Sequence, residues 1–142
     1  MNHDRYEDTY LADILRSVKT IALVGASPNA ARASYGVMRF LLARDYHVIP
    51  VNPGQAGKEI LGQAVYGRLA DISVPVDMVD VFRAPEYLSS VIDEAAALQP
   101  RPKVVWSQLG VRDDAAAARA EAAGIQVVMN RCPAIEYPRL LG

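Results

Sequence analysis

The sequence is poor in the features that mark several classes of protein. Its 142 residues include one cysteine, Cys132, which excludes an internal disulfide framework and fits a reducing compartment. No apolar run is long enough to cross a bilayer, and residues 1–18 lack the apolar stretch of a secretory signal. The net charge is only −1, so the chain has no overall attraction to nucleic acid or to an anionic membrane. These absences predict a cytoplasmic protein in which any anion-binding site is local.

What the sequence does contain is an alternation of short apolar runs with amphipathic segments. Five runs predict buried strands, at residues 20–25, 46–51, 76–82, 103–106 and 125–129. Helices are predicted at residues 7–17, 34–44, 85–98 and 113–123, and residues 134–142 are expected to pack across the surface as a tail. Strands that alternate with helices pair in parallel through right-handed crossovers. The sequence therefore predicts a single Rossmann-like, doubly wound α/β domain over residues 1–142, with a five-stranded parallel sheet.

Ligands of such sheets bind beyond the carboxyl ends of the strands, and a cation follows each of the five predicted ends. In chain order these cations are Arg32, Lys58, Arg83, Arg112 and Arg131. Each one alone is explained as a solvated loop charge. As a set on one rim, facing a shared pocket, they predict a site for a ligand that carries several phosphates.

The loop from Gly25 to Ser34 is the sharpest local feature of the chain. A glycine directly after a buried strand allows a tight turn, and the N-terminus of the next helix offers free amides to a phosphate. Ser27 and Ser34 add hydroxyl groups, Ser34 is the expected N-cap of the helix, and Arg32 can bind a phosphate through two N–H groups. The alternative is a plain strand-to-helix connection, which favours the same residue types.

The fingerprint of dinucleotide-binding folds is only partly present. Its second glycine position is Ala26 or Ser27. The second strand ends in Val51, Asn52 and Pro53, where an NAD-dependent enzyme has the acidic residue that binds the ribose. A small NAD(P)-dependent oxidoreductase therefore remains as the weaker alternative to a binding protein.

An ordered series of short motifs runs through residues 18–135. Its members are Val24-Gly-Ala-Ser27, Arg32-Ala-Ser34, Ile49-Pro-Val-Asn-Pro53, Asp80-Val-Phe-Arg-Ala-Pro85, Gln108-Leu-Gly110 and Asn130-Arg-Cys-Pro133. The series resembles the small stand-alone CoA-binding proteins, which are similar to the amino-terminal CoA-binding domain of the succinyl-CoA synthetase α subunit and of ADP-forming acyl-CoA synthetases. The resemblance implies a Rossmann-like domain that binds CoA or an acyl-CoA.

The resemblance also implies roles for individual residues. The first loop, with Gly25, Ala26, Ser27, Arg32 and Ser34, would cradle the phosphates. The residues Asn52 and Pro53 and the loop to Lys58 would flank the nucleotide, and Phe82 and Arg83 would lie near the adenine. The predicted set of ligand-contacting residues is completed, after the fourth and fifth strands, by Gln108 and Cys132.

Two departures limit what the resemblance implies. The synthetase domain has a lysine after the Pro-Gly of the second strand, whereas this chain has Gln55, so Lys58 would have to supply that charge. The synthetases also carry a phosphorylated histidine in a second domain. The histidines here are His3, expected in a frayed terminus, and His47, and neither matches that motif. Ligase chemistry is therefore not expected of this chain acting alone.

No group of residues has the spacing of a catalytic or metal-binding set, so we predict neither. We interpret Cys132 as a small buried apolar residue, with disulfide exchange with the CoA thiol as the alternative. The prediction is thus a protein that binds CoA without evident catalysis of its own. It would act alone, as a homo-oligomer, or with a synthetase-like partner chain.

Overall fold

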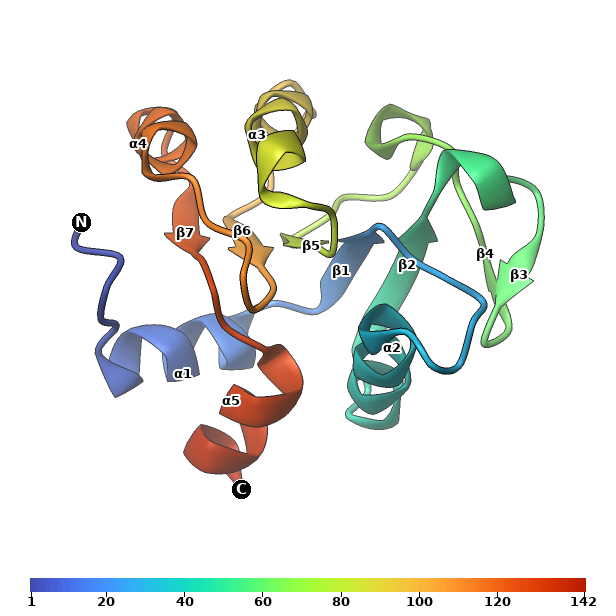
Figure 1. Ribbon diagram of the computed structural model, residues 1–142, viewed down its shortest axis with the longest axis horizontal. Coiled ribbons are helices and arrows are strands. Elements are labelled where there is room, and N and C mark those ends of the chain that lie inside the picture. The colour runs from blue at the N-terminus through green and yellow to red at the C-terminus, as the bar shows by residue number, and fades with distance from the viewer.

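A computed structural model describes all residues, 1–142, as a sheet between two layers of helices (Figure 1). The five strands are ordered β2-β1-β5-β6-β7, and every neighbouring pair is parallel. They are β1 (Thr20–Val24), β2 (His47–Val51), β5 (Met78–Val81), β6 (Val104–Ser107) and β7 (Gln126–Val128). The predicted fold class is confirmed, and each strand begins and ends within two residues of its expected position.

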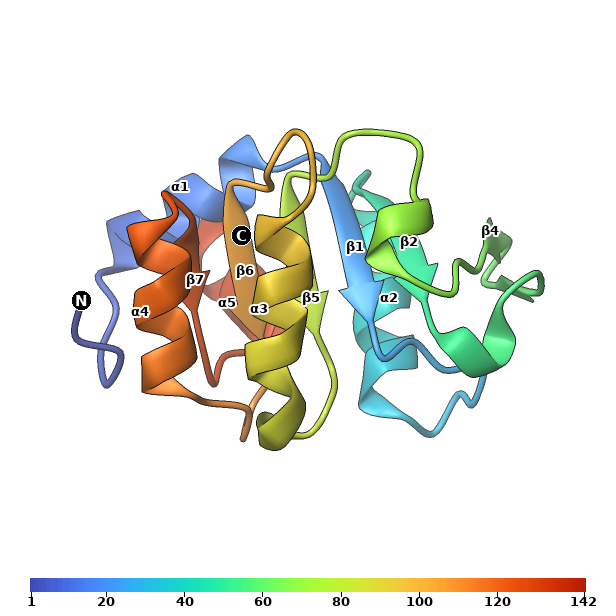
Figure 2. The ribbon, with the colours of Figure 1, turned by 90° about the horizontal axis from the view of Figure 1, so that it is seen from above.

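Helices cover both faces of the sheet (Figure 2). One face carries α3 (Leu88–Ala96) and α4 (Asp114–Ala122), and the other carries α1 (Asp8–Ser17), α2 (Ala33–Ala43) and α5 (Pro133–Leu141). None of them has the length and apolarity that crossing a bilayer requires.

Two helical segments differ from the prediction. The helix expected at residues 85–98 is a 3-10 turn, Pro85–Tyr87, followed by α3. The expected surface tail is the helix α5, which packs beside α1 and α2 although Pro138 lies inside it. Pro133 occupies the first turn of α5, where its fixed φ favours helix initiation and no N–H is needed.

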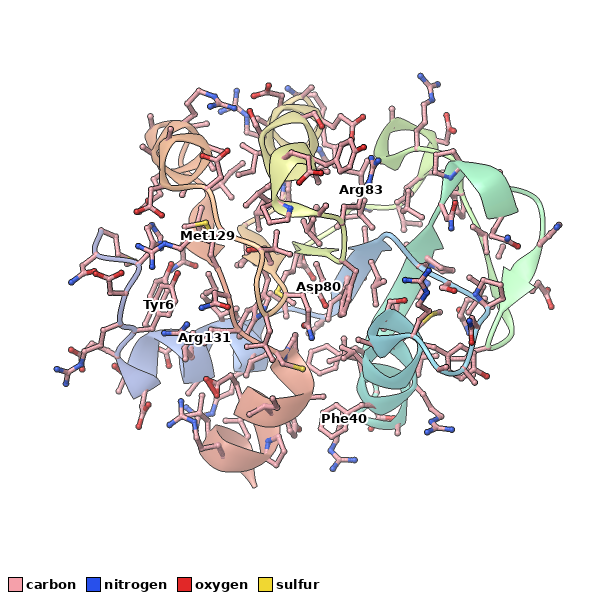
Figure 3. The ribbon with its side chains drawn as sticks, in the orientation of Figure 1. Tyr6, Phe40, Asp80, Arg83, Met129 and Arg131 are labelled. Carbon is pink, nitrogen blue, oxygen red and sulfur yellow. The ribbon has the colours of Figure 1, made fainter.

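The strands are mostly apolar because the sheet is buried on both faces. Successive residues of a strand point to opposite faces, so Ile21 and Leu23 face α1, α2 and α5, whereas Ala22 and Val24 face α3 and α4. All four side chains are buried. The same alternation places Asp80 of β5 beside Leu23, on the face of the sheet that α1, α2 and α5 cover (Figure 3).

The long connection from β2 to β5 lies beyond the β2 edge of the sheet. It contains 3-10 turns at Pro53–Gln55 and Leu69–Asp71 and a small antiparallel hairpin of β3 (Glu59–Ile60) and β4 (Gln63–Ala64). Shortly after the hairpin, Tyr66 forms a parallel bridge to Val51. The hairpin itself was not predicted.

Residues before α1 close the opposite edge, at β7. The Tyr6 hydroxyl accepts the Met129 N–H at 2.8 Å (Figure 3). The ring nitrogens of His3 lie 2.7 Å from that hydroxyl and 2.9 Å from a carboxylate oxygen of Glu121 on α4. The expectation of a frayed terminus at His3 was therefore wrong, because its ring is buried between Tyr6 and the distant helix α4.

The strand order reverses at β1. The chain runs outward from β1 to β2, returns past β1 to β5, and then continues outward to β7. The helix after β1 covers one face, and the helix after β5 covers the other. The two connections therefore diverge at the carboxyl ends of these strands, which is where this architecture binds ligands.

Candidate functional site

A cleft of about 410 Å³ lies at the carboxyl ends of β1 and β5, where the strand order reverses. It is formed by the loop after β1, the first turn of α2, the residue after β2 and the turn after β5. Its lining residues are Gly25, Ala26, Ser27, Arg32, Ala33, Ser34, Asn52, Phe82, Arg83, Ala84 and Tyr87. Eight of the residues predicted to contact ligand are among them.

Gly25 brings the connections after β1 and β5 into contact. Its φ is +92°, and a Cβ atom at this position would lie 2.9 Å from the Phe82 carbonyl oxygen. Its N–H donates to the Val51 carbonyl at 3.0 Å, which ties the turn to β2 as well. Only glycine adopts this conformation without strain and leaves room for the neighbouring backbone. The glycine after the first strand is thus required by the geometry of the cleft.

Polar side chains fix the shape of the loop that follows. The Ser27 hydroxyl accepts the Asn29 N–H at 3.1 Å, and the Asn29 side-chain oxygen accepts the Ala31 N–H at 2.9 Å. The Asn52 side-chain amide donates to the Ala26 carbonyl at 2.7 Å. The asparagine at the end of β2 therefore holds the loop after β1 in place.

Free backbone donors line the cleft at the start of α2. The N–H groups of Ser27, Ala33 and Ser34 have no hydrogen-bond partner within the protein. The N-cap of α2 is Arg32, without a side-chain capping bond, so the expectation that Ser34 caps this helix was wrong. Ser34 is instead the second helical residue, where a backbone N–H has no partner within the helix. Such donors, with the positive end of the helix dipole, suit an anion.

Two arginines add positive charge to the cleft, and neither is in an ion pair. Arg32 is exposed at the start of α2. The guanidinium of Arg83, beside α3 in Figure 3, lies over the ring of Tyr87 at 4.1 Å. The arginine and the tyrosine together form a flat wall on the β5 side of the cleft.

Three of the five predicted cations do not line the cleft, so the prediction of one shared cationic rim was wrong for Lys58, Arg112 and Arg131. Arg112 forms ion pairs of 2.7 Å with Asp4 and with Asp114. The guanidinium of Arg131 lies 4.9 Å from the Tyr6 ring and donates to the Asp4 carbonyl at 3.4 Å. Both are held by the N-terminal segment, which the order of the sequence could not place beside the connections after β6 and β7.

Four further residues predicted to contact ligand do not line this cleft: Pro53, Lys58, Gln108 and Cys132. Lys58 is exposed just before β3, and Gln108 directly follows β6. Cys132 is the N-cap residue of α5 and is 7% exposed among apolar side chains. This burial favours its interpretation as a small apolar residue. No group of three or more His, Cys, Asp or Glu side chains comes together to hold a metal ion.

A second depression of about 240 Å³ adjoins the first on the α3 side and shares Gly25, Asn52 and Arg83 with it. Its other lining residues are Val24, Val51, Pro53, Gly67, Arg68, Leu69 and Glu94. The sequence analysis missed Tyr87 and Arg68. Tyr87 occupies the third residue of the Pro85–Tyr87 turn, and Arg68 follows a glycine, but neither pattern by itself indicates a ligand.

Comparisons with known proteins connect this geometry to a family. A family model described as a CoA binding domain matches residues 19–138. The uncharacterized protein YneT of Bacillus subtilis (strain 168) is 34% identical over 122 residues, which make up 86% of this chain and 87% of the relative.

Similar solved structures come from several organisms. A hypothetical protein from Pyrococcus horikoshii OT3 is 37% identical, with a TM-score of 0.91 over 100% of this chain and 97% of that one. A Thermus thermophilus protein is 38% identical, with a TM-score of 0.89 over 96% and 100%. A dinucleotide-forming acetyl-coenzyme A synthetase from Ca. Korarchaeum cryptofilum shares the fold at 22% identity and a TM-score of 0.64, over 77% of this chain and 25% of the synthetase. Since the family model matches most of its length, the chain belongs to the CoA-binding domain family.

Proposed function

We propose that the protein binds CoA or an acyl-CoA in the cleft between β1 and β5 and does not itself transform it. The observation that carries this proposal is the group of unpartnered N–H donors of Ser27, Ala33 and Ser34 beside the unpaired Arg32. A pyrophosphate offers several oxygens to such donors, and a helix N-terminus favours its negative charge.

The remaining walls suit the other parts of the ligand. The guanidinium of Arg83 and the ring of Tyr87 form a planar surface of the kind on which an adenine stacks. Asn52 and Arg83 line both depressions, and Pro53 lines the second, so a nucleotide that passes from one to the other would be flanked by these residues.

The chemistry of the cleft supports binding rather than catalysis or NAD recognition. No histidine, cysteine or carboxylate is among its lining residues. Asn52 occupies the place of the acidic residue that binds the ribose of NAD. Its amide is engaged at both ends, because the nitrogen donates to Ala26 and the oxygen accepts the Gly54 N–H at 2.8 Å.

Calorimetric titration with CoA, dephospho-CoA and NAD tests the proposal. We expect CoA to bind and to raise the melting temperature. The substitution Arg32→Ala should raise the Kd for CoA by about tenfold to a hundredfold, the scale of a lost charge-assisted hydrogen bond. The matched control is Arg39→Ala, because Arg39 is exposed on the same helix but does not line the cleft. If NAD binds and CoA gives neither heat nor thermal stabilisation, the proposal fails.

A further inference from the structure

The buried side-chain polar atoms that lack a partner belong to two residues on neighbouring strands or their ends. Three buried side-chain polar atoms have no hydrogen-bond partner: both carboxyl oxygens of Asp80 and Oε1 of Gln108. Asp80 is completely buried. Buried polar groups are nearly always paired in folded proteins, so each exception calls for an explanation.

The strand register brings these two residues to the same face of the sheet. Asp80 is aligned with Trp106 of β6, and Gln108 follows two residues later, with its N–H donating to the Val81 carbonyl at 3.1 Å. Because residues two apart on a strand share a face, the Gln108 side chain leaves the sheet on the side of Asp80. Diagonal positions on neighbouring strands are about 7–8 Å apart, within the reach of a long side chain. Phe82 lies on this face too and lines the cleft, so the pair is beside the cleft wall.

No charged group compensates the Asp80 carboxyl group. The apolar cluster on this face contains the titratable side chains Tyr6, Tyr10, Tyr35, Tyr46, Tyr137 and Cys132. Two further titratable groups lie against Tyr6 at its border: the ring of His3, which is also bound to Glu121, and the guanidinium of Arg131. The carboxylate of Glu136 on α5 is bound by Arg139 at 3.0 Å. Burial alone therefore raises the pKa of Asp80 well above its usual value, which favours the protonated acid.

The two ends of the Gln108 amide differ in exposure. Its oxygen is among the buried unpartnered atoms, whereas its nitrogen is not. The Gln108 side chain therefore turns its amide oxygen inward, on the face of the sheet that carries Asp80. The NH₂ group, with its two donor hydrogens, points outward. A protonated carboxyl group has one O–H to donate, and an amide oxygen accepts it.

We propose that Asp80 is a positioning residue: it carries a proton that it donates to Oε1 of Gln108, and this bond holds the Gln108 NH₂ group outward, beside the cleft. There the NH₂ group donates to a carbonyl or phosphate oxygen of the bound ligand. When Asp80 loses its proton, the amide turns over so that its nitrogen donates to the carboxylate. The amide oxygen then faces the ligand, and a donor is replaced by an acceptor. The inference rests on the proposed function, because the ligand in question is CoA.

The test is the Kd for CoA as a function of pH, from about pH 5 to about pH 9, for the wild-type protein and for Asp80→Asn. The NH₂ group of the introduced amide can donate to Gln108 at every pH, so this variant should bind as tightly as the wild type at low pH. The wild-type Kd should then rise by about tenfold or more relative to the variant as Asp80 ionises. Ionisation of CoA itself affects both proteins alike and cancels in their ratio. The substitution Gln108→Leu should weaken binding and remove the dependence on Asp80.

An infrared difference spectrum between the wild-type protein and Asp80→Asn provides a readout that is independent of binding. The wild type should show the carbonyl band of a protonated carboxyl group at neutral pH. If that band is absent, or if the two proteins bind CoA with the same pH dependence, the inference is overturned while the proposed function stands. If neither protein binds CoA at any pH, the proposed function itself is overturned.

Discussion

The substitution Asp80→Asn should change how the stability of the fold depends on pH, apart from any effect on ligand. In the unfolded chain this carboxyl group ionises near its ordinary pKa of 3.8, whereas complete burial raises its pKa in the folded protein. Between these two values the folded protein holds a proton that the unfolded chain has released. The free energy of unfolding therefore falls as the pH rises. The stabilisation by the bound proton is fully present below the pKa of the unfolded chain. It is then lost progressively as the pH rises to the pKa of the folded protein.

The size of the effect follows from the linkage between proton binding and folding. Each pH unit in this window lowers the free energy of unfolding by about 1.4 kcal/mol. This slope is large beside the roughly 5–15 kcal/mol that stabilises an ordinary domain. Asparagine has nearly the same size and does not ionise. The stability of Asp80→Asn relative to the wild type should therefore rise with pH by this amount per unit and then level off at the folded pKa.

Urea unfolding at a series of pH values measures this difference. The fluorescence of Trp106, the only tryptophan and a fully buried one, reports the transition. The control is Asp13→Asn, because the Asp13 side chain is 78% exposed and its ion pair with Arg16 is long, at 3.9 Å. We expect the stability of this control relative to the wild type to stay nearly constant. A constant difference for Asp80→Asn as well would refute the conclusion that the fold buries this carboxyl group without compensation.

Two further predictions concern the close backbone contact at Gly25 and the hydrogen bond by which Tyr6 closes the β7 edge of the sheet. The substitution Gly25→Ala should destabilise the protein by about 1–3 kcal/mol in thermal unfolding, because the methyl group would meet a backbone carbonyl at a positive φ. Gly36→Ala, in the open middle of α2, should instead stabilise it by about 0.5–1 kcal/mol, and equal effects at the two sites would contradict the strained turn. The substitution Tyr6→Phe leaves the buried Met129 N–H, just after β7, without its acceptor and should lower the free energy of unfolding by about 1–2 kcal/mol. Tyr137→Phe, which keeps only aromatic contacts in either form, should change it by less than about 0.5 kcal/mol, so similar losses in both would argue against edge closure by the hydroxyl.

The strands were predictable because burial on both faces makes each one mostly apolar, as in Thr20–Val24. No local sequence pattern predicts the order of the strands in the sheet, since that order depends on how the helices pack. The helix α5 was missed for a similar reason. Pro138 in its middle indicates a break, and contact with α1 and α2 stabilises a helix there nonetheless.

The part of the cleft that comes from one continuous segment of the chain was predictable. The segment from Gly25 to Ser34 follows a strand and begins a helix, so its free amides could be anticipated from position alone. Arg112 could not be placed in the same way, because its partner Asp4 is 108 positions away in the sequence. The lack of a partner for the Asp80 carboxyl group was equally hidden, since it depends on which side chains distant helices place against β5.

The N-terminal segment also shapes how negative charge approaches the protein. At the β6 and β7 end of the sheet, Arg112 is shared between two carboxylates, and Arg131 lies against an aromatic ring. Arg32 and Arg83, at the β1 and β5 end, have no acidic partner. On this side of the molecule the arginines without an acidic partner therefore lie at one end of the sheet, near the turn at Gly25. Long-range attraction to this end would steer the proposed polyphosphate ligand toward the cleft before contact.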